Sequence, residues 1–117
     1  MLPRITIITI CYNAASTISR TLRSVQAQTY PHLEYLVIDG ASRDTTLELV
    51  SELAPRAKAF SEPDRGIYDA MNKGLARATG DYVWYVNAGD ALAKATTVED
   101  LVRATCSGDH LPDVLYG

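Results

Sequence analysis

Short apolar runs alternate with amphipathic segments along the whole chain, and polar clusters separate them. The apolar runs are rich in β-branched and aromatic residues, which is typical of strands. Four strands are predicted, over residues 4–9, 33–38, 57–61 and 82–86, and a fifth begins at 114–116. The segments between them carry apolar residues at helical spacing. They predict helices over residues 15–28, 67–77 and 97–105, and another that ends at Pro55.

The order of these elements predicts an α/β domain with a mostly parallel sheet and helices on both faces, in a doubly wound, Rossmann-like arrangement. Right-handed crossovers place the first strand beside the fourth, with the second and third strands on its other side. Asn13 or Ser16 is the expected N-cap of the first helix, and Asp44 or Thr45 that of the second.

Three polar clusters directly follow predicted strands, at residues 9–13, 39–44 and 87–90. In a parallel sheet the carboxyl ends of all strands lie along one edge, and ligands bind at this edge. The three clusters therefore predict a single binding site that carries acid and amide side chains.

Composition narrows the class of protein. At 117 residues, with 47% hydrophobic and 21% charged residues, the chain matches one small globular domain with a single core. A net charge of -3 offers no basic surface, which argues against nucleic-acid binding. Cys11 and Cys106 form no CxxC pair, so a reducing, cytoplasmic compartment without structural zinc is expected. We expect Cys11 to be a small buried residue at a strand end.

Asp39 directly follows a predicted buried strand and precedes Gly40, where the backbone has to turn. A fixed carboxylate at this place can accept hydrogen bonds from a nucleobase N–H or from ribose hydroxyls. It can equally form an Asx turn with Ser42 or cap the next helix. The spacing alone leaves these alternatives even.

The cluster at residues 87–90 has two interpretations as well. Asp90 can bind a hard divalent cation that bridges a carboxylate to substrate phosphates, and Asn87 can bind a ribose or sugar hydroxyl. Asn, Gly and Asp together are also ordinary turn residues, and the cluster taken alone favours a turn.

Arg65 precedes the helix predicted over residues 67–77, so a positive charge and a helix N-terminus converge there. Together they favour a phosphate group. The alternative is a solvated loop charge. Asp69 and Asn72 share one face of that helix, which either lines the cleft or faces solvent.

Several familiar motifs are absent from the sequence. There is no GxGxxG after the first strand, no GxxxxGK[ST], no GxSxG and no HExxH. These absences argue against a dinucleotide cofactor bound in the usual mode and exclude a P-loop. A nucleoside diphosphate held by carboxylates and a metal ion fits the remaining features best.

Four stretches in order resemble the GT-A-fold glycosyltransferases of family 2, which are inverting enzymes that use nucleotide-diphospho-sugars. Residues 5–13 look like the family's opening strand and Tyr-Asn turn, and residues 37–46 are similar to its Asp-Gly-x-Ser-x-Asp-x-Thr segment. Residues 61–74, Ser-Glu-Pro-Asp-Arg-Gly-Ile-Tyr-Asp-Ala-Met-Asn-Lys-Gly, are the most specific stretch, and residues 78–82 complete it. The resemblance covers nearly the whole chain.

The resemblance implies a nucleotide-binding role for several residues. Thr9, Tyr12 and Asn13 would line the nucleoside pocket, Asp39 would contact the base, and Arg65 would contact the diphosphate.

The resemblance also places Asn87 and Asp90 in the segment that binds metal and ribose, which is usually an Asp-x-Asp-like element. Asn87 replaces the first aspartate of that element, and Gly89 stands where the second would fall. Asp90 is therefore the expected ligand of a Mg²⁺ or Mn²⁺ ion, and Asn87 joins the nucleotide-binding residues.

The implied reaction transfers a sugar from a UDP-, GDP- or dTDP-sugar to a hydroxyl of a saccharide or lipid-linked acceptor, in polysaccharide or glycolipid assembly. The acceptor hydroxyl attacks the anomeric carbon and nucleoside diphosphate leaves, with the metal acting as a Lewis acid. In this family the base is an aspartate or glutamate from the later half, so it is expected beyond residue 117. Residues 1–117 are interpreted as a single, truncated donor-binding domain without the acceptor half.

Two further expectations concern partners. The intact parent would associate peripherally with the inner face of the membrane. An unfinished sheet edge favours a homodimer.

Two other interpretations stay open. The missing aspartates of residues 87–90 favour a non-catalytic nucleotide-sugar-binding module or an inactive fragment. A flavodoxin-like receiver or scaffold domain also carries carboxylates at strand ends, although residues 61–74 match the transferases better.

Overall fold

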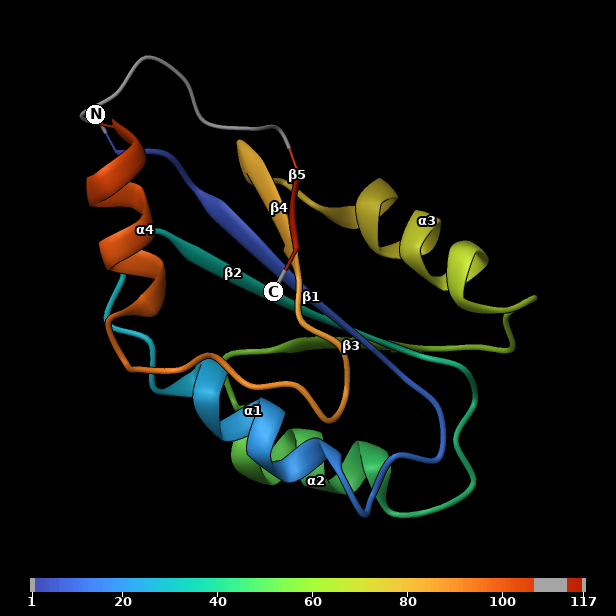
Figure 1. Ribbon diagram of the computed structural model, residues 1–117. Helices are drawn as coiled ribbons and strands as arrows, with labels where there is room; N and C mark the ends of the chain where they lie inside the picture. Colours follow the sequence, from blue (N-terminus) through green and yellow to red (C-terminus); the bar gives the residue numbers. More distant parts are fainter. Residues whose placement is uncertain (1, 107–113, 117) are drawn as a thin grey trace.

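A computed structural model describes residues 2–106 and 114–116 of the chain. Its centre is a five-stranded sheet with all strands parallel, in the order β3-β2-β1-β4-β5 (Figure 1). The strands are β1 (Ile5–Cys11), β2 (Leu33–Asp39), β3 (Lys58–Ser61), β4 (Tyr82–Tyr85) and β5 (Val114–Tyr116). The predicted order of the first four strands is confirmed, and β5 continues the sheet beside β4.

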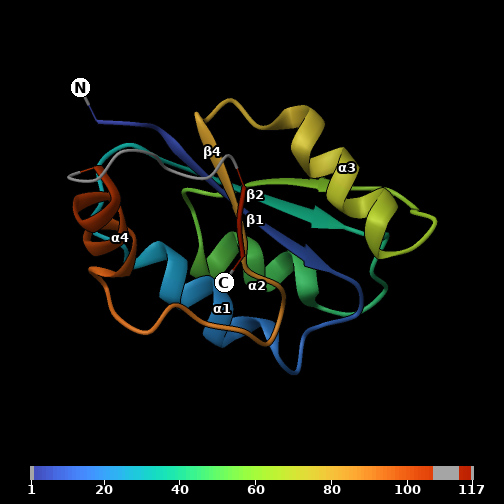
Figure 2. The ribbon, with the colours of Figure 1, turned by 45° about the horizontal axis from the view of Figure 1, so that its top comes forward.

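Helices cover both faces of the sheet, as predicted. They are α1 (Ile18–Gln26), α2 (Thr46–Leu53), α3 (Ile67–Arg77) and α4 (Thr97–Cys106). Figure 2 shows α1 and α2 below the sheet and α3 above it. No helix in residues 2–106 has the length and apolar character that a membrane crossing requires.

Two cores form because the central strands are buried on both faces. Ile5 and Ile7 of β1 pack in the larger core, which α1, α2 and α4 cover, whereas Ile8 packs in the smaller core under α3. A strand buried on both sides reads as a continuous apolar run, which is why residues 5–8 carry no polar alternation beyond Thr6. Gly74 allows the close approach of α3, because a Cβ there would meet Ile8 Cγ2 at 2.8 Å.

The start of α1 differs from the prediction. Neither Asn13 nor Ser16 caps it: Thr17 is the N-cap, and it forms no side-chain capping hydrogen bond. The reason is that the backbone before the helix pairs with another loop, since Ala14 N–H donates to Thr46 Oγ1 and Ala15 N–H to Asp44 Oδ2.

The start of α2 agrees with the prediction, which gave Asp44 or Thr45 as its N-cap. Thr45 occupies the N-cap position, although its own side chain makes no capping hydrogen bond. Asp44 supplies the acceptor instead, because its Oδ1 accepts the N–H of Thr46 at 3.0 Å.

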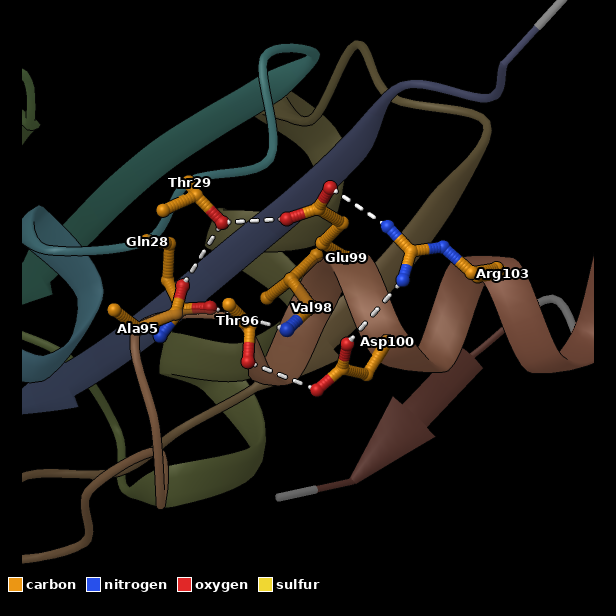
Figure 3. A network of polar contacts seen from close by, with 8 residues as sticks. All are labelled: Gln28, Thr29, Ala95, Thr96, Val98, Glu99, Asp100 and Arg103. Atoms are coloured by element: carbon orange, nitrogen blue, oxygen red, sulfur yellow. Dashed lines mark hydrogen bonds and ion pairs between the residues drawn. The ribbon is translucent and has the colours of Figure 1, made fainter.

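The segment after α1 and the start of α4 are joined by a polar network (Figure 3). Gln28 Oε1 accepts the N–H of Val98 at 3.0 Å, and Thr29 Oγ1 donates to Glu99 Oε2 at 2.7 Å. Arg103 pairs with Glu99 one turn further along α4. These contacts hold α4 against the larger core, and with it the segment that returns from β4.

Candidate functional site

The carboxyl ends of β1, β2 and β3 lie at one edge of the sheet, on the side where α3 begins (Figure 1). The loops that follow them surround a cavity of about 380 Å³ that is open to solvent, which we call the edge cavity. It is lined by Tyr12, Gly40, Ala41, Arg43, Pro63 and Asp64. The clusters after the first and second strands therefore meet as predicted, and the loop after β3 joins them.

A second cavity of about 300 Å³ lies between the end of β1 and the start of α3, and we call it the α3 cavity. It is lined by Ile10, Cys11, Tyr12, Asp64, Gly66, Ile67 and Ala70. Tyr12 and Asp64 line both cavities. The side chain of Tyr12 is 62% exposed, so its ring offers an open face beside the edge cavity.

The loops after β1 and β2 are fastened to each other. Asn13 N–H donates to Ser42 Oγ at 2.7 Å, and Arg43 N–H donates to Asn13 Oδ1 at 2.8 Å. Asn13 and Ala41 have positive φ angles of 46° and 63°, a conformation that asparagine tolerates and alanine adopts at a cost of about 1 kcal/mol or more. Asn13 therefore braces the frame of the edge cavity.

Asp39 is buried, with 1% of its surface exposed, and its carboxylate is fully engaged. Oδ2 accepts hydrogen bonds from Ser42 N–H and Ser61 Oγ, both at 2.8 Å. Oδ1 accepts from Ser42 Oγ and from Cys11 Sγ. The structure contains the Asx turn with Ser42 that was one of the alternatives for Asp39. Contact of Asp39 with a base stays a prediction.

Cys11 is buried at the end of β1, as predicted. Burial raises the pKa of its thiol, and the neighbouring carboxylate of Asp39 raises that pKa further. The sulfur therefore stays protonated and serves as a hydrogen-bond donor to Asp39, not as a nucleophile.

Thr9 does not line the pocket, and the expectation for it is wrong. Its side chain is completely buried, and Oγ1 lies 2.7 Å from both the Tyr35 hydroxyl and the carbonyl oxygen of Val86, to which it donates. The predicted strand ended at Thr9, whereas β1 continues to Cys11 and pairs with Asp39 there. Thr9 consequently lies inside the sheet, and the open edge begins at Tyr12.

The loop after β4 runs beside the end of β1 and packs on α1. Ala88 N–H donates to the carbonyl of Ile10, Gly89 N–H donates to Thr21 Oγ1 at 2.9 Å, and Thr21 Oγ1 donates to the carbonyl of Asp90. This third cluster reaches the same edge of the sheet as predicted, on the α1 side and outside the lining of the two cavities.

Side-chain oxygens of Asn87 and Asp90 in this loop lack partners among the described residues. Asn87 Oδ1 is buried and accepts no hydrogen bond from the described residues. Asp90 is exposed, and its carboxylate has no hydrogen-bond or ion-pair partner in the part of the chain that the structure describes. Within that part, no group of three or more His, Cys, Asp or Glu residues could hold a metal ion. Carboxylate and amide oxygens of this kind are the ligands that a hard cation accepts beside water and phosphate.

Arg65 is exposed just before α3 and lies outside the lining of both cavities. Its N–H donates to Asp69 Oδ2 at 2.9 Å, and this hydrogen bond is the main reason why the pKa of Asp69 lies below its ordinary value. Lys73 adds an ion pair to the same oxygen at 3.4 Å. The side chain of Arg65 forms no hydrogen bond or ion pair with the described residues, and its contact with a diphosphate stays a prediction.

Sequence reasoning missed two residues of the edge cavity, Arg43 and Asp64. Both stand inside the stretches that carry the family resemblance, but each is surrounded by polar neighbours and lies in no periodic pattern. Only the approach of three loops in space singles them out.

Comparison with known proteins gives a consistent picture. The family described as Glycosyl transferase family 2 matches residues 6–112. An uncharacterized glycosyltransferase of Mycobacterium tuberculosis is 39% identical over 117 residues, a match that covers 98% of this chain and 44% of that protein. A PGL/p-HBAD biosynthesis glycosyltransferase of the same species is 35% identical over 120 residues, which covers 98% of this chain and 46% of that protein. The chain thus spans less than half the length of these relatives.

Solved structures agree with the fold. TarS of S. aureus, residues 1–349, in complex with UDP-GlcNAc superposes with a TM-score of 0.81 at 22% identity, over 93% of this chain and 37% of that one. The mannosyltransferase PcManGT from Pyrobaculum calidifontis, in complex with GDP-Man and Mn²⁺, has a TM-score of 0.75 at 32% identity, over 89% of this chain and 32% of that one.

Proposed function

The chain belongs to glycosyltransferase family 2, and on this premise we propose that residues 1–117 bind the nucleoside diphosphate of a nucleotide-sugar donor at the carboxyl edge of the sheet. The intact protein would transfer the sugar to a saccharide or lipid-linked hydroxyl in polysaccharide or glycolipid assembly. The edge cavity, with the exposed ring of Tyr12 beside it, is the observation that carries the proposal.

The cavity has the chemistry that a nucleoside requires. An open aromatic face such as that of Tyr12 can stack on a base, and stacked aromatic pairs gain about 0.5–1.5 kcal/mol beyond the area they bury. Arg43 and Asp64 line the cavity and offer a donor and an acceptor to the edge of a base. Asn13 and Asp39 keep the three loops in place by the hydrogen bonds described above.

A Mg²⁺ or Mn²⁺ ion is part of the proposal. The carboxylate of Asp90 and the amide oxygen of Asn87 would hold it, because neither side-chain group has a hydrogen-bond partner for these oxygens among the described residues. A magnesium-type ion is often bound by one or two carboxylates together with substrate phosphates. When bound, it would neutralise the charge that develops on the departing diphosphate.

The donor, the acceptor and the catalytic base also belong to the proposal. Among similar proteins, PcManGT has been solved with GDP-Man and TarS with UDP-GlcNAc, so uridine and guanosine donors both have precedents. One relative is named a PGL/p-HBAD biosynthesis glycosyltransferase, and we propose a saccharide or lipid-linked hydroxyl as the acceptor of the intact protein. The base is proposed to lie outside residues 1–117, because the relatives extend over more than twice the matched length.

Calorimetric titration of the chain with UDP, GDP and dTDP, each with and without Mn²⁺, tests the proposal. Saturable binding of at least one nucleotide that strengthens with Mn²⁺ is expected, and Asp90→Asn is expected to remove the metal effect. Nucleotide binding of the same strength with and without Mn²⁺ would favour a non-catalytic nucleotide-sugar-binding module. If no nucleotide binds under either condition, the proposed function is wrong.

A further inference from the structure

Resting on that proposed function and going beyond it, we infer that Asp64, and not Asp39, is the carboxylate that reads the base of the donor. Asp64 would accept a hydrogen bond from a ring N–H next to a carbonyl group. The bases of this class are uracil, thymine and guanine. Cytosine and adenine place an acceptor nitrogen at the same position, so the site would reject them.

The first reason is that Asp39 has no acceptor capacity to spare. A carboxylate accepts about four hydrogen bonds, and Asp39 already accepts one each from Cys11 Sγ, Ser61 Oγ, Ser42 N–H and Ser42 Oγ. It is also 1% exposed and lies outside the lining of the edge cavity. A base could reach it only by displacing one of these buried partners.

The second reason is that Asp64 presents a free oxygen at the cavity. Its Oδ1 accepts the N–H of Gly66 at 3.1 Å, which fixes the orientation of the carboxylate. Its Oδ2 accepts no hydrogen bond from any described residue, and Asp64 lines both the edge cavity and the α3 cavity.

The absence of a side chain at Gly40 makes room for this carboxylate. A Cβ at Gly40 would lie 2.7 Å from Asp64 Oδ2, which is closer than real Cβ contacts come. Gly40 has an ordinary backbone conformation, so its value here is space and not a positive φ angle. The close fit brings Asp64 against the loop after β2, where Arg43 also lines the cavity.

The loop that carries Asp64 is anchored at both ends, so the free oxygen is held in advance of binding. Glu62 N–H donates to the carbonyl of Asp39 at 3.0 Å, which joins the loop to the end of β2. Lys73 of α3 donates to the carbonyl of Pro63 at 2.8 Å and pairs with Glu62 at 3.3 Å. Lys73 is thus a positioning residue for Asp64.

The chemistry of an ionised carboxylate decides which bases fit. It is an acceptor only, so it binds a ring N–H and repels a ring nitrogen that carries a lone pair. Hydrogen bonds to charged groups are strong enough to give about tenfold or greater discrimination. UDP against CDP, and GDP against ADP, are therefore the matched pairs, because within each pair only the first member carries the N–H.

The experiment measures dissociation constants for both pairs by calorimetry at one fixed Mn²⁺ concentration, on the full chain. The wild type should bind UDP about tenfold or more tightly than CDP, or GDP than ADP, whichever pair it accepts. Asp64→Asn should lose most of that preference, because its amide can donate to the acceptor nitrogen. Gly40→Ala, which leaves Asp64 intact but displaces it, should reduce the preference too.

Two further variants distinguish reading of the base from general effects. Asp39→Asn should lower stability and weaken the binding of both members of a pair, because Asp39 ties the loops together, but UDP or GDP should still bind more tightly than its partner. Glu52→Gln removes one exposed charge from α2 and should change nothing. If Asp64→Asn keeps the wild-type ratio, Asp64 does not read the base and the inference is wrong. A wild type that prefers CDP or ADP would also overturn it, whereas a wild type that binds no nucleotide removes the proposed function together with the inference.

Discussion

The strand β2 carries a buried carboxylate near each end, and the two ends serve different purposes. Glu34, near the amino end, accepts hydrogen bonds from Thr6 Oγ1, from the N–H and Oγ1 of Thr79, and from Arg4. Asp39, at the carboxyl end, accepts its four from Cys11, Ser42 and Ser61. Each carboxylate therefore joins separate chain segments to β2 with the same kind of hydroxyl and amide donors.

The surroundings of the two carboxylates differ. At the amino end the contacts close tightly, since Gly80 N–H donates to Thr6 Oγ1 and a Cβ at Gly80 would lie 2.5 Å from that atom. At the carboxyl end the loops tied by Asp39 stand around the edge cavity, and Asp64 brings a second carboxylate with a free oxygen. A saturated carboxylate thus builds structure at both ends, and ligand chemistry falls to the neighbour that is left unsaturated.

Glu34→Ala should have the largest effect on stability. It leaves the buried donors of Thr6 and Thr79 without their acceptor, which costs about 3 kcal/mol of unfolding free energy. Urea denaturation measures the change, with Glu52→Ala on the exposed face of α2 as the control. A loss as small as that of the control would mean that water replaces Glu34 at the amino end.

Asp39→Asn should lower the unfolding free energy by less, about 2 kcal/mol. The amide keeps one acceptor oxygen, but its NH₂ group faces donors that the second carboxylate oxygen had accepted. The same urea series measures it. A neutral result would show that the loops after β1, β2 and β3 are held mainly by other contacts, such as those of Asn13, and the parallel between the two ends of β2 would break down.

The pH dependence of stability should separate Glu34 from the other carboxylates. Burial acts to raise the pKa of Glu34, but hydrogen bonds from Thr79 and Thr6 outweigh it, so this pKa lies below its ordinary value of 4.5. The stabilisation is complete above the unfolded-state pKa and is lost as the pH falls through the lower folded-state pKa. The difference in unfolding free energy between wild type and Glu34→Gln should therefore shrink as the pH falls below about 5, through the range in which carboxyl groups titrate. A constant difference would contradict the assignment.

The arrangement of the sheet could be predicted because it depends on the spacing of apolar residues along the sequence. Strands buried on both faces read as continuous apolar runs, and the spacing of Ile67, Ala70 and Met71 marks α3, whose bounds agree with the prediction. The burial of Cys11 followed from the same reasoning, since a small apolar residue at a strand end has no local reason to be exposed.

The details of the site could not be predicted, because they depend on where strands end and on contacts between distant segments. Thr9 was expected at the open edge, in the polar cluster at residues 9–13, but parallel pairing carries β1 on to Cys11 opposite Asp39. Asp64 has no periodic signal, and its place depends on Gly40, which lies 24 positions away in the sequence (64 − 40). The conformational preferences of a residue and its sequence neighbours determine neither where β1 ends nor that Gly40 and Asp64 come into contact.

Arg4→Gln should have the smallest effect on stability, and it tests whether Glu34 and Asp39 are held by the same kind of donor. Arg4 is the one charged donor to Glu34 among the described residues, at 3.4 Å, and its side chain is 51% exposed, so water screens the ion pair. Pairs of this kind contribute about 0.5 kcal/mol, and less at high salt. Urea denaturation in low salt and in about 1 M NaCl, where the Debye length falls to roughly 3 Å, should show a small loss that nearly vanishes in the salt. The neutral donors of Thr6 and Thr79 would then hold Glu34, as serine hydroxyls and an amide hold Asp39 without any cation. A loss as large as that of Glu34→Ala would instead make the amino end an ion-pair site, chemically different from the carboxyl end.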